Sequence, residues 1–330
     1  MYVIEQLFLS RSRRIFVLVW KSKNMNHTLV VIVGPTGIGK TKTAIEVARR
    51  FNTEIISADS RQLYREMSVG TAVPSEAELL QAKHHFVHIL SVHDYYNASR
   101  FEEEALARLE QLFQQYPLVV MAGGSMLYID ALCKGIDDLP TVDPEIRRQL
   151  IEKFEKEGIE SLRFELKRVD PAYYAQVDLK NPKRLLHALE ISLMTGKPYS
   201  QLRTNPNKQR PFHILKIGLN TDRARLHERI NQRVEQMVEA GLEQEARSLY
   251  PFRSANALNT VGYREWFDYF DGKTDRQSAI ELIKRNTRQY ARKQLTWFRR
   301  DPEINWFDTE NCNQIIPFIE SKISEYESAR

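Results

Sequence analysis

The sequence predicts an α/β fold in which a doubly wound parallel sheet is interrupted by a helical insertion. Three observations support this fold class. Before residue 135, short apolar runs alternate with helical stretches, the pattern of parallel strands joined by right-handed crossover helices. A glycine-rich turn joins the first run to a helix. From residue 137 to about residue 211, charged helical segments occur without a convincing strand, and strand character then resumes.

The elements of the first part follow these apolar runs. Three strands are expected, at residues 29–33, 54–58 and 118–122. The first is a continuous apolar run, typical of a strand buried on both faces. Helices should follow the first strand, from Thr41 to about Phe51, and the third strand, from Ser125.

The second half of the chain is expected to complete a core that an insert splits. Helices are predicted at residues 144–157 and 182–195, a strand at 213–219 and a long amphipathic helix at about 223–249. The expected domains are an N-terminal extension (1–24), the first part of the core (25–137), a helical insert (138–210), and the rest of the core with basic C-terminal helices (211–330).

Composition bounds the classes of protein to which the chain can belong. Its 330 residues are 42% hydrophobic and 28% charged, with a formal net charge of +5. This mild excess permits a polyanionic partner without requiring one. Two distant cysteines exclude a disulfide framework and a cysteine-based zinc site, which favours a reducing, cytoplasmic location. No apolar run is long enough to span a membrane, so no membrane partner is expected.

The N-terminus lacks the features of a signal peptide. Residues 11–14 are basic, but the apolar run at 15–20 is short and no small-residue cleavage site follows. The first predicted strand begins only after Met25. We therefore expect Met25 to be the true start and residues 1–24 to be a loosely ordered extension.

The glycine-rich turn carries the most specific motif. Its eight residues fit the pattern G-x-x-x-x-G-K-[ST]: Gly34, Pro35, Thr36, Gly37, Ile38, Gly39, Lys40 and Thr41. In such a loop, backbone N–H groups and the helix N-terminus surround a phosphate. Lys40 would neutralise a phosphate oxygen, and the Thr41 hydroxyl would reach Mg²⁺. The motif predicts a di- or triphosphate site without saying which compound binds.

Two further strand ends place polar groups at the same edge of the sheet, where open α/β folds build their sites. Asp59 follows the second strand and has three interpretations: a Mg²⁺ ligand, a general base, or a cap for a helix beyond Ser60. Gly123-Gly124 follows the third strand and allows a ligand to approach the backbone. Ser125 could contact a substrate or cap the next helix. Capping is the preferred interpretation, because serine is common at the N-cap position.

The C-terminal third indicates nucleic-acid binding. Residues 282–300 contain seven lysines and arginines and no acidic residue. Helical spacing places Arg285, Arg288, Arg292 and Arg299 on one face, beside Tyr290 and Trp297. A solvated charged face normally mixes both signs, so this stripe favours contact with a phosphate backbone.

Four histidines, His84, His85, His88 and His93, raise the alternative of a metal site. No cysteine or H-E-x-x-H pattern accompanies them, so capping or surface roles are preferred.

Together these motifs resemble the tRNA dimethylallyltransferase (isopentenyl-diphosphate:tRNA transferase) family. The resemblance extends from Leu29 to the C-terminus. Beyond the phosphate loop, it rests on Ser57-Ala58-Asp59-Ser60-Arg61-Gln62-Leu63-Tyr64, Gly123-Gly124-Ser125-Met126-Leu127-Tyr128, Asn181-Pro182-Lys183-Arg184 running to Ala188-Leu189-Glu190, Thr195-Gly196-Lys197-Pro198, Val261-Gly262-Tyr263-Arg264, and Thr287-Arg288-Gln289 through Lys293-Gln294-Leu295-Thr296-Trp297.

The resemblance implies a P-loop fold related to the nucleotide kinases, with an insert that grips the anticodon stem-loop of tRNA. It implies that the phosphate loop holds dimethylallyl diphosphate with Mg²⁺, and that the target is N6 of the adenosine 3′ of the anticodon. Asp59 matches the general base, Thr36 a residue near the donor, and Arg223 a diphosphate-binding arginine. On spacing alone, Arg223 would be a surface residue. We expect a monomer.

The resemblance and the basic stripe together imply a set of residues that contact tRNA. They are Asp59, Ser60, Arg61, Gln62, Ser125, Arg147, Lys183, Arg184, Leu185, Leu186, His187, Asn259, Thr260, Val261, Gly262, Tyr263, Arg264, Arg288, Arg292, Lys293, Trp297 and Arg299. The alternative functions are an adenylate isopentenyltransferase, with a free nucleotide as acceptor, and a small-molecule P-loop kinase. The insert and the stripe favour the larger RNA substrate.

Overall fold

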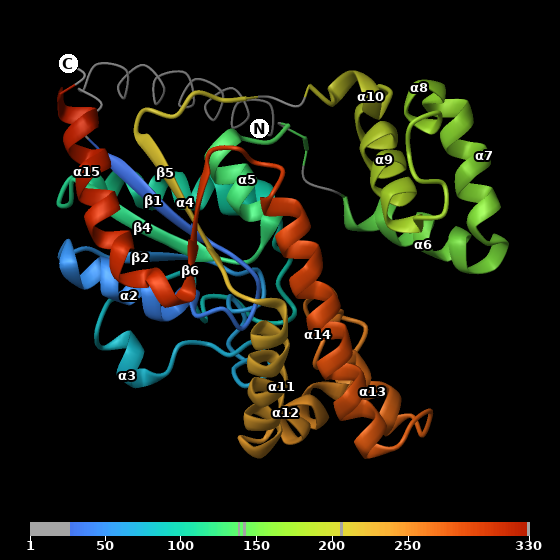
Figure 1. The fold of residues 1–330 in the computed structure, drawn as a ribbon. Helices are drawn as coiled ribbons and strands as arrows, with labels where there is room; N and C mark the ends of the chain where they lie inside the picture. The colour runs from blue at the N-terminus through green and yellow to red at the C-terminus, as the bar shows by residue number, and fades with distance from the viewer. Residues whose placement is uncertain (1–26, 138, 141–142, 205–206, 329–330) are drawn as a thin grey trace. The chain divides into compact units, whose positions relative to one another are not determined.

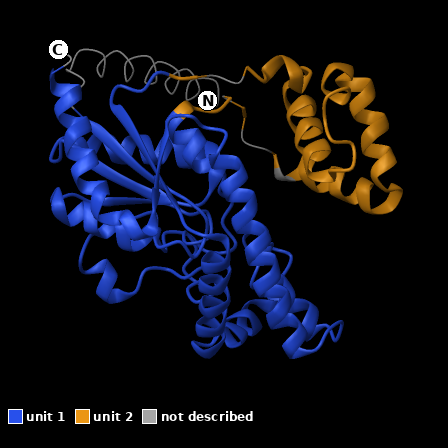
Figure 2. Ribbon diagram, viewed as in Figure 1, with its two compact units in different colours: residues 1–133, 209–330 blue, residues 134–208 orange. Residues whose placement is uncertain are grey.

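The computed structural model describes residues 27–137, 139–140, 143–204 and 207–328. The chain divides into two compact units (Figure 2). Unit 1 takes in the chain up to Cys133 and from Gln209 onward, and unit 2 is Lys134–Lys208. The predicted insert was 138–210. The predicted extension 1–24 and the proposed start at Met25 lie outside the described residues.

A six-stranded parallel sheet forms the centre of unit 1 (Figure 1). Its strand order is β3-β2-β4-β1-β5-β6. The strands are β1 (Thr28–Val33), β2 (Ile55–Ala58), β3 (His84–His85), β4 (Leu118–Gly123), β5 (His213–Asn220) and β6 (Ile304–Asp308). The α/β class and the four strands predicted from the sequence are confirmed. The edge strands β3 and β6 were not predicted.

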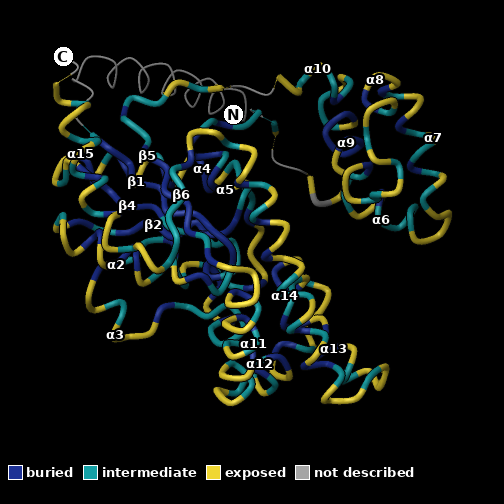
Figure 3. The backbone as a smooth tube through the Cα atoms, in the orientation of Figure 1, coloured by how far each residue is buried: buried dark blue, intermediate teal, exposed yellow. Residues whose placement is uncertain are grey.

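The sheet is buried on both faces, which Figure 3 shows as dark tubes at its centre. Leu29, Val31 and Val33 pack into one apolar cluster, and the alternate residues Val30 and Ile32 pack into another. Successive side chains of a strand point to opposite faces, so a strand covered on both sides must be apolar throughout. This explains the unbroken apolar run of β1.

Helices surround the sheet of unit 1. They are α2 (Lys40–Arg50), α3 (Glu76–Leu79), α4 (Ala98–Phe113), α5 (Met126–Lys134), α11 (Arg223–Glu239), α12 (Leu242–Leu249), α13 (Arg264–Phe270), α14 (Arg276–Phe298) and α15 (Ile315–Ser328). The prediction of one helix over 223–249 was wrong. Gly241 adopts a φ of 99°, a left-handed conformation that ends α11 and starts α12. No helix in the described parts is long and apolar enough to cross a membrane.

Unit 2 is built from helices around its own apolar core. They are α6 (Pro144–Glu157), α7 (Ile159–Val169), α8 (Pro171–Tyr174), α9 (Pro182–Thr195) and α10 (Tyr199–Leu202). The two predicted helices, α6 and α9, are confirmed at both ends. Each begins with proline after a capping residue: Asp143 accepts from the backbone N–H of Glu145, and Asn181 accepts from that of Arg184.

Candidate active site at the phosphate loop

One pocket lies where the carboxyl ends of β1, β2 and β4 meet. It brings together most of the predicted phosphate-loop residues with the polar groups that follow the other two strands. Its lining includes Thr36, Gly37, Gly39, Lys40, Thr41, Asp59, Gln62, Gly123 and Gly124. Sequence reasoning did not single out five other lining residues, Ser57, His84, Arg233, Tyr290 and Gln294, as parts of such a pocket.

The loop between β1 and α2 has the backbone that its glycines predict. Gly34 has a φ of 149°, and a Cβ there would lie 2.8 Å from the carbonyl oxygen of Leu219 on β5. Gly39 has a φ of 105° and is the N-cap of α2. The N–H groups of the first turn of α2 have no partner within the helix and receive no side-chain cap from Gly39, the arrangement that favours an anion.

Lys40 is held close to the loop that precedes it. Its Nζ donates to the carbonyl oxygen of Pro35 at 2.8 Å. Burial, together with the charge of Arg233, lowers the pKa of Lys40 to about 7, while the charge of Asp59 opposes the shift. The Lys40 ammonium thus loses its proton far more readily than an exposed lysine. A bound phosphate would stabilise the charged form.

Asp59 lies in the turn after β2 and interacts with Lys40 across the pocket. Its Oδ1 accepts from the backbone N–H of Arg61 at 2.9 Å, which leaves the second oxygen for a ligand. The interpretation of Asp59 as a helix cap was wrong, because residues 60–63 form a turn and no helix follows. The roles of general base and Mg²⁺ ligand both fit its position.

Ser125 joins the ends of β2 and β4. Its Oγ accepts from the backbone N–H of Ser60 at 2.8 Å and donates to Ser60 Oγ at 3.1 Å. A Cβ at Gly123 would lie 2.2 Å from the carbonyl oxygen of Ala58, so only glycine allows this close approach of the two strands. The Ser125 hydroxyl therefore fixes the loop that carries Asp59.

Gln294 connects α14 to the phosphate loop. Its Oε1 accepts from the backbone N–H of Thr36 at 2.8 Å, and its Nε2 donates to the carbonyl oxygen of Gly124 at 2.9 Å. The residue is 1% exposed. Gln294 thereby ties together two loops and a helix. Its place in a Lys-Gln-Leu-Thr-Trp motif was the only signal in the sequence.

The arginine that α11 contributes to the pocket is Arg233, not Arg223. Arg223 is exposed at the first position of α11 and is not among the lining residues. Arg233 lies ten positions later and lines the pocket. Burial lowers the pKa of Arg233, while the carboxylates of Asp59 and Glu78 offset part of this effect. Arg233 therefore brings a second cation into the pocket that Lys40 lines.

Arg61 contacts the chain just before the segment 259–264. The Arg61 guanidinium donates to the carbonyl oxygens of Asn256, at 3.2 Å, and Ala257, at 3.0 Å. Gly262 has a φ of 97°, and Tyr263 is fully buried with its hydroxyl donating to Glu245 at 2.7 Å.

The other members of this segment differ in exposure. Asn259 and Arg264 are exposed, while Thr260 and Val261 are half-buried. Tyr263 is thus a core residue that shapes the turn. Within this segment, Asn259 and Arg264 present the most surface to a partner.

The basic stripe on α14 is partly engaged with the protein. Arg292, Lys293 and Arg299 are exposed, whereas Arg288 donates to Asn231 Oδ1 on α11 at 2.6 Å. Trp297 is half-buried against the core, and its Nε1 donates to Asp130 at 2.8 Å. Tyr290 lines the pocket, and burial raises its pKa to about 12.

Unit 2 carries the remaining predicted tRNA contacts on α6 and α9. Lys183, Arg184 and His187 reach the surface, and Arg147 is half-buried. Leu185 lies in the core of the unit and Leu186 packs against it. The two leucines therefore hold α9 in place, and the basic residues form its accessible surface.

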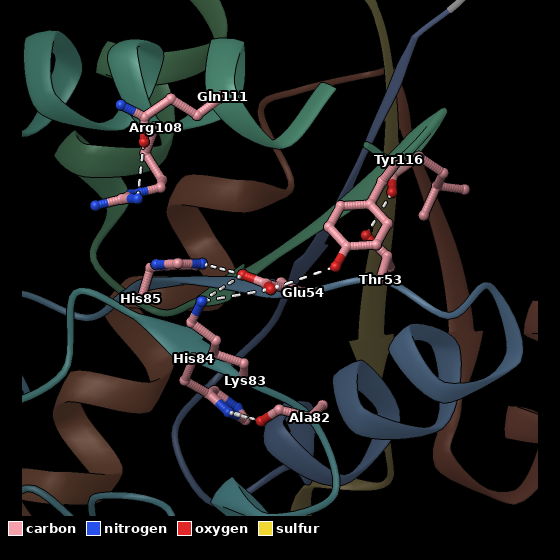
Figure 4. A network of polar contacts seen from close by, with 10 residues as sticks. Thr53, Glu54, Ala82, Lys83, His84, His85, Arg108, Gln111 and Tyr116 are labelled. Carbon is pink, nitrogen blue, oxygen red and sulfur yellow. Dashed lines mark hydrogen bonds and ion pairs between the residues drawn. The ribbon is translucent and has the colours of Figure 1, made fainter. Parts of the chain in front are cut away.

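The histidines of β3 belong to a polar network around Glu54 (Figure 4). His85 Nε2 contacts Glu54 Oε2 at 2.5 Å, and Lys83 and the Tyr116 hydroxyl donate to the same carboxylate. His84 Nδ1 donates to the carbonyl oxygen of Ala82 at 2.8 Å, and burial lowers the pKa of His84. Among the described residues, no three His, Cys, Asp or Glu form a group that could hold a metal. The network fastens the short strand β3 to β2.

Comparison with known proteins places this chain in a family. A family model described as IPP transferase matches residues 62–301. The tRNA dimethylallyltransferase 1 of Bacteroides fragilis is 55% identical over 90% of this chain and 98% of its own length. The chain belongs to the tRNA dimethylallyltransferase family. It is therefore a prenyl-transferring enzyme, and the family favours this activity over a small-molecule kinase or an adenylate isopentenyltransferase.

Solved structures agree with this assignment. The tRNA isopentenylpyrophosphate transferase of Bacillus halodurans is 35% identical, with a TM-score of 0.67 over 92% of this chain and 99% of that one. A eukaryotic dimethylallyltransferase acting on tRNA is 24% identical, with a TM-score of 0.73 over 91% of this chain and 80% of that one. The latter shares the fold, which confirms the expected P-loop architecture of this enzyme.

Proposed function

We propose that this enzyme transfers a dimethylallyl group from dimethylallyl diphosphate to N6 of the adenosine 3′ of the anticodon in tRNA. One observation carries the proposal: a phosphate loop and a turn bearing Asp59 share one pocket, and a basic helix, α14, supplies part of its wall. The phosphate loop suits the leaving group, Asp59 suits the reacting amine, and the exposed cations of α14 suit a polyanionic acceptor.

The diphosphate of the donor would bind to the loop between β1 and α2. Backbone N–H groups at the start of α2, together with Lys40 and Arg233, would surround its oxygens. These groups stabilise the negative charge that grows on the diphosphate as its bond to the allyl carbon breaks. Because Lys40 is held by the carbonyl oxygen of Pro35 and Arg233 already lines the pocket before the donor arrives, little reorganisation is needed during the reaction.

The pocket also fits Mg²⁺. The Thr41 hydroxyl is an oxygen ligand that lines the space beside the diphosphate site. Mg²⁺ commonly takes one or two protein oxygens and completes its shell with substrate phosphates and water. The ion would supply positive charge to the departing diphosphate.

Asp59 would act as the general base. The exocyclic amine of adenine is a weak nucleophile because its lone pair is delocalised into the ring. As N6 bonds to the allyl carbon and the carbon–oxygen bond to diphosphate breaks, the amine must lose a proton, and Asp59 can accept it. Ser125 and the backbone of Arg61 hold the turn that bears this carboxylate.

The acceptor must leave its stack to reach this pocket. Extruding a loop base costs a few kcal/mol, which new contacts offset, and single-stranded loop bases are the usual targets of sequence-specific RNA readers. Arg292, Lys293 and Arg299 on α14, with Lys183 and Arg184 on α9, are cations at the surface that suit the RNA backbone.

The test is incubation with radiolabelled dimethylallyl diphosphate, Mg²⁺ and unmodified tRNA, followed by digestion to nucleosides. We expect the label in N6-dimethylallyladenosine. Label on free AMP in a parallel reaction, without label in tRNA, would assign the enzyme to small nucleotides. Transfer to neither acceptor, with phosphate transfer from ATP, would support a kinase.

We also propose that the enzyme acts as a monomer in the cytoplasm. The two cysteines, Cys133 and Cys312, are free, which suits a reducing compartment. Light scattering of the purified enzyme, alone and with tRNA, tests the oligomeric state.

A further inference from the structure

Unit 2 contains a buried carboxylate that lacks hydrogen bonds. Glu190, on α9, is 1% exposed. Neither of its carboxylate oxygens has a hydrogen-bond partner among the described residues. A buried charge without such partners is costly, and buried polar groups normally have one. The position of Glu190 therefore calls for a reason other than the stability of the unit.

Two basic side chains lie next to this carboxylate. Arg147 Nη1, on α6, is 3.6 Å from Glu190 Oε2, and His187 Nδ1, one turn earlier on α9, is 3.8 Å from the same oxygen. These side chains are 43% and 46% exposed. Tyr199 packs against the His187 ring at a centroid distance of 5.6 Å. The carboxylate thus lies beneath two basic groups that reach the surface.

The surface above Glu190 is basic. Lys183 and Arg184 lie in the first turn of α9 and reach solvent. Lys183 and His187 are four positions apart, so they share a face of the helix. An exposed acid beside these groups would repel RNA phosphates, whereas a buried acid attracts basic side chains from below and leaves their outer sides free. The buried position of Glu190 therefore suits a surface that binds a polyanion.

We propose that Glu190 is a positioning residue for tRNA binding. Its buried charge holds Arg147 and His187 in the orientations in which they meet phosphates of the RNA backbone. The inference rests on the proposed function and adds a residue that does not itself touch the RNA. It explains why unit 2 retains a buried charge without hydrogen bonds: the charge lowers the stability of the unit and orders its binding surface.

Glu190→Gln tests this role because it keeps the shape of the side chain and removes its charge. We expect the KM for tRNA to rise about three- to tenfold, since charge-assisted contacts are weakened rather than deleted. The kcat and the KM for dimethylallyl diphosphate should stay unchanged. The thermal unfolding midpoint should equal or exceed that of the wild type, because a poorly compensated buried charge is removed.

Glu165→Gln is the matched control. Glu165, on α7 of the same unit, is mostly buried and makes a full ion pair with Lys153 at 2.7 Å. Its replacement should lower the unfolding midpoint and leave the KM for tRNA unchanged. Adding Glu190→Gln to a variant that already carries Arg147→Gln and His187→Gln should leave tRNA binding unchanged, because Glu190 acts only through these two side chains.

Two results would overturn the role of Glu190. One is an unchanged KM for tRNA in Glu190→Gln. The other is a raised KM with a lowered unfolding midpoint, which indicates that the residue is only structural. Transfer to tRNA by the wild-type enzyme, measured in the same experiment, tests the proposed function separately. Its absence would refute that function, whereas the ratio between variant and wild type tests the inference.

Discussion

Individual residues set the charge of the phosphate pocket. Lys40 and Arg233 face the space that a diphosphate would occupy, and Asp59 interacts with both. Burial is the chief cause that lowers the pKa of Lys40 to about 7. Above that pH the free enzyme loses the Lys40 charge, and a bound diphosphate would restore it.

Donor binding should therefore take up a proton at alkaline pH. We predict that dimethylallyl diphosphate binds with almost no proton uptake at about pH 6 and with uptake approaching one proton at about pH 8.5, and that its affinity falls as the pH rises above about 7. Calorimetry in buffers of different ionisation enthalpy measures this uptake.

Two variants control this measurement. Lys40→Arg should abolish the uptake, because arginine stays charged. Lys42→Met should retain it, since Lys42 is exposed on α2. Equal uptake at the two pH values in the wild type would contradict a lowered pKa of Lys40.

Some residues of the pocket could be predicted from the sequence, and others could not. The spacing of glycines, Lys40 and Thr41 is a local pattern, so the phosphate loop could be predicted. The role of Gln294 was not predicted, because its two partners lie 258 and 170 residues away along the chain. Arg223 and Arg233 occupy the same helix, and only the packing of α11 determines which of them reaches the pocket.

At the scale of elements, α14 contributes to both the pocket and the basic surface. Gln294 fixes the phosphate loop from its buried side, while Arg292 and Lys293 just before it are exposed. One helix thus reaches the donor site with one face and solvent with the other. These two faces should have separable effects on donor and tRNA.

Gln294→Leu should impair use of the donor without weakening tRNA binding. The change leaves the Thr36 N–H and the Gly124 carbonyl unpaired, so kcat/KM for dimethylallyl diphosphate should fall about ten- to hundredfold. The Kd for tRNA should stay unchanged. Gln277→Leu, at an exposed position near the start of α14, should leave both parameters unchanged. If Gln294→Leu weakened tRNA binding as much as it lowered kcat/KM for the donor, the two faces of α14 would not have separate roles.

Neutralising the exposed stripe should reduce the salt dependence of tRNA binding. In a double variant, Arg292→Gln with Arg299→Gln, the slope of log K against log salt should become shallower by about 0.7–0.9 for each phosphate that is no longer neutralised. Arg148→Gln is the control, because Arg148 is exposed on α6 but engaged with Glu145 and Glu152 at 2.6 Å. Identical slopes in the wild type and both variants would indicate that Arg292 and Arg299 do not contact RNA phosphates.

Elements were predictable where local signals mark them. The bounds of α6 and α9 were predicted correctly. Proline and a capping residue mark the start of each helix. The break between α11 and α12 was missed, since a glycine within an amphipathic pattern does not by itself end a helix. The strand β3, with only two residues, is too short to show a period and depends on its pairing with β2.

At the scale of the whole molecule, the enzyme combines a P-loop unit with a helical unit inserted into it. The ends of the insert meet: the backbone N–H of Lys208 donates to the carbonyl oxygen of Lys134 at 2.7 Å. A short linker between these residues can therefore replace the helical unit with little strain on unit 1, which has its own apolar clusters.

Replacing residues 135–207 with two glycines should weaken tRNA binding without changing donor binding. We predict that the shortened enzyme binds dimethylallyl diphosphate with unchanged affinity and binds tRNA at least about tenfold more weakly, because it neutralises fewer phosphates. Calorimetry and filter binding measure the two affinities. A shortened protein that folds, shown by an intact thermal transition, and binds tRNA normally would exclude unit 2 from recognition.

In the proposed mechanism, Asp59 removes a proton from a tRNA adenosine in the phosphate-loop pocket. Single-turnover transfer to an anticodon stem-loop, by wild-type enzyme and by Asp59→Asn with both substrates saturating, tests this role. We predict a rate about 10²- to 10⁴-fold lower for Asp59→Asn, with an unchanged Kd for the stem-loop. A variant that transfers the dimethylallyl group at a near-normal rate would contradict this assignment.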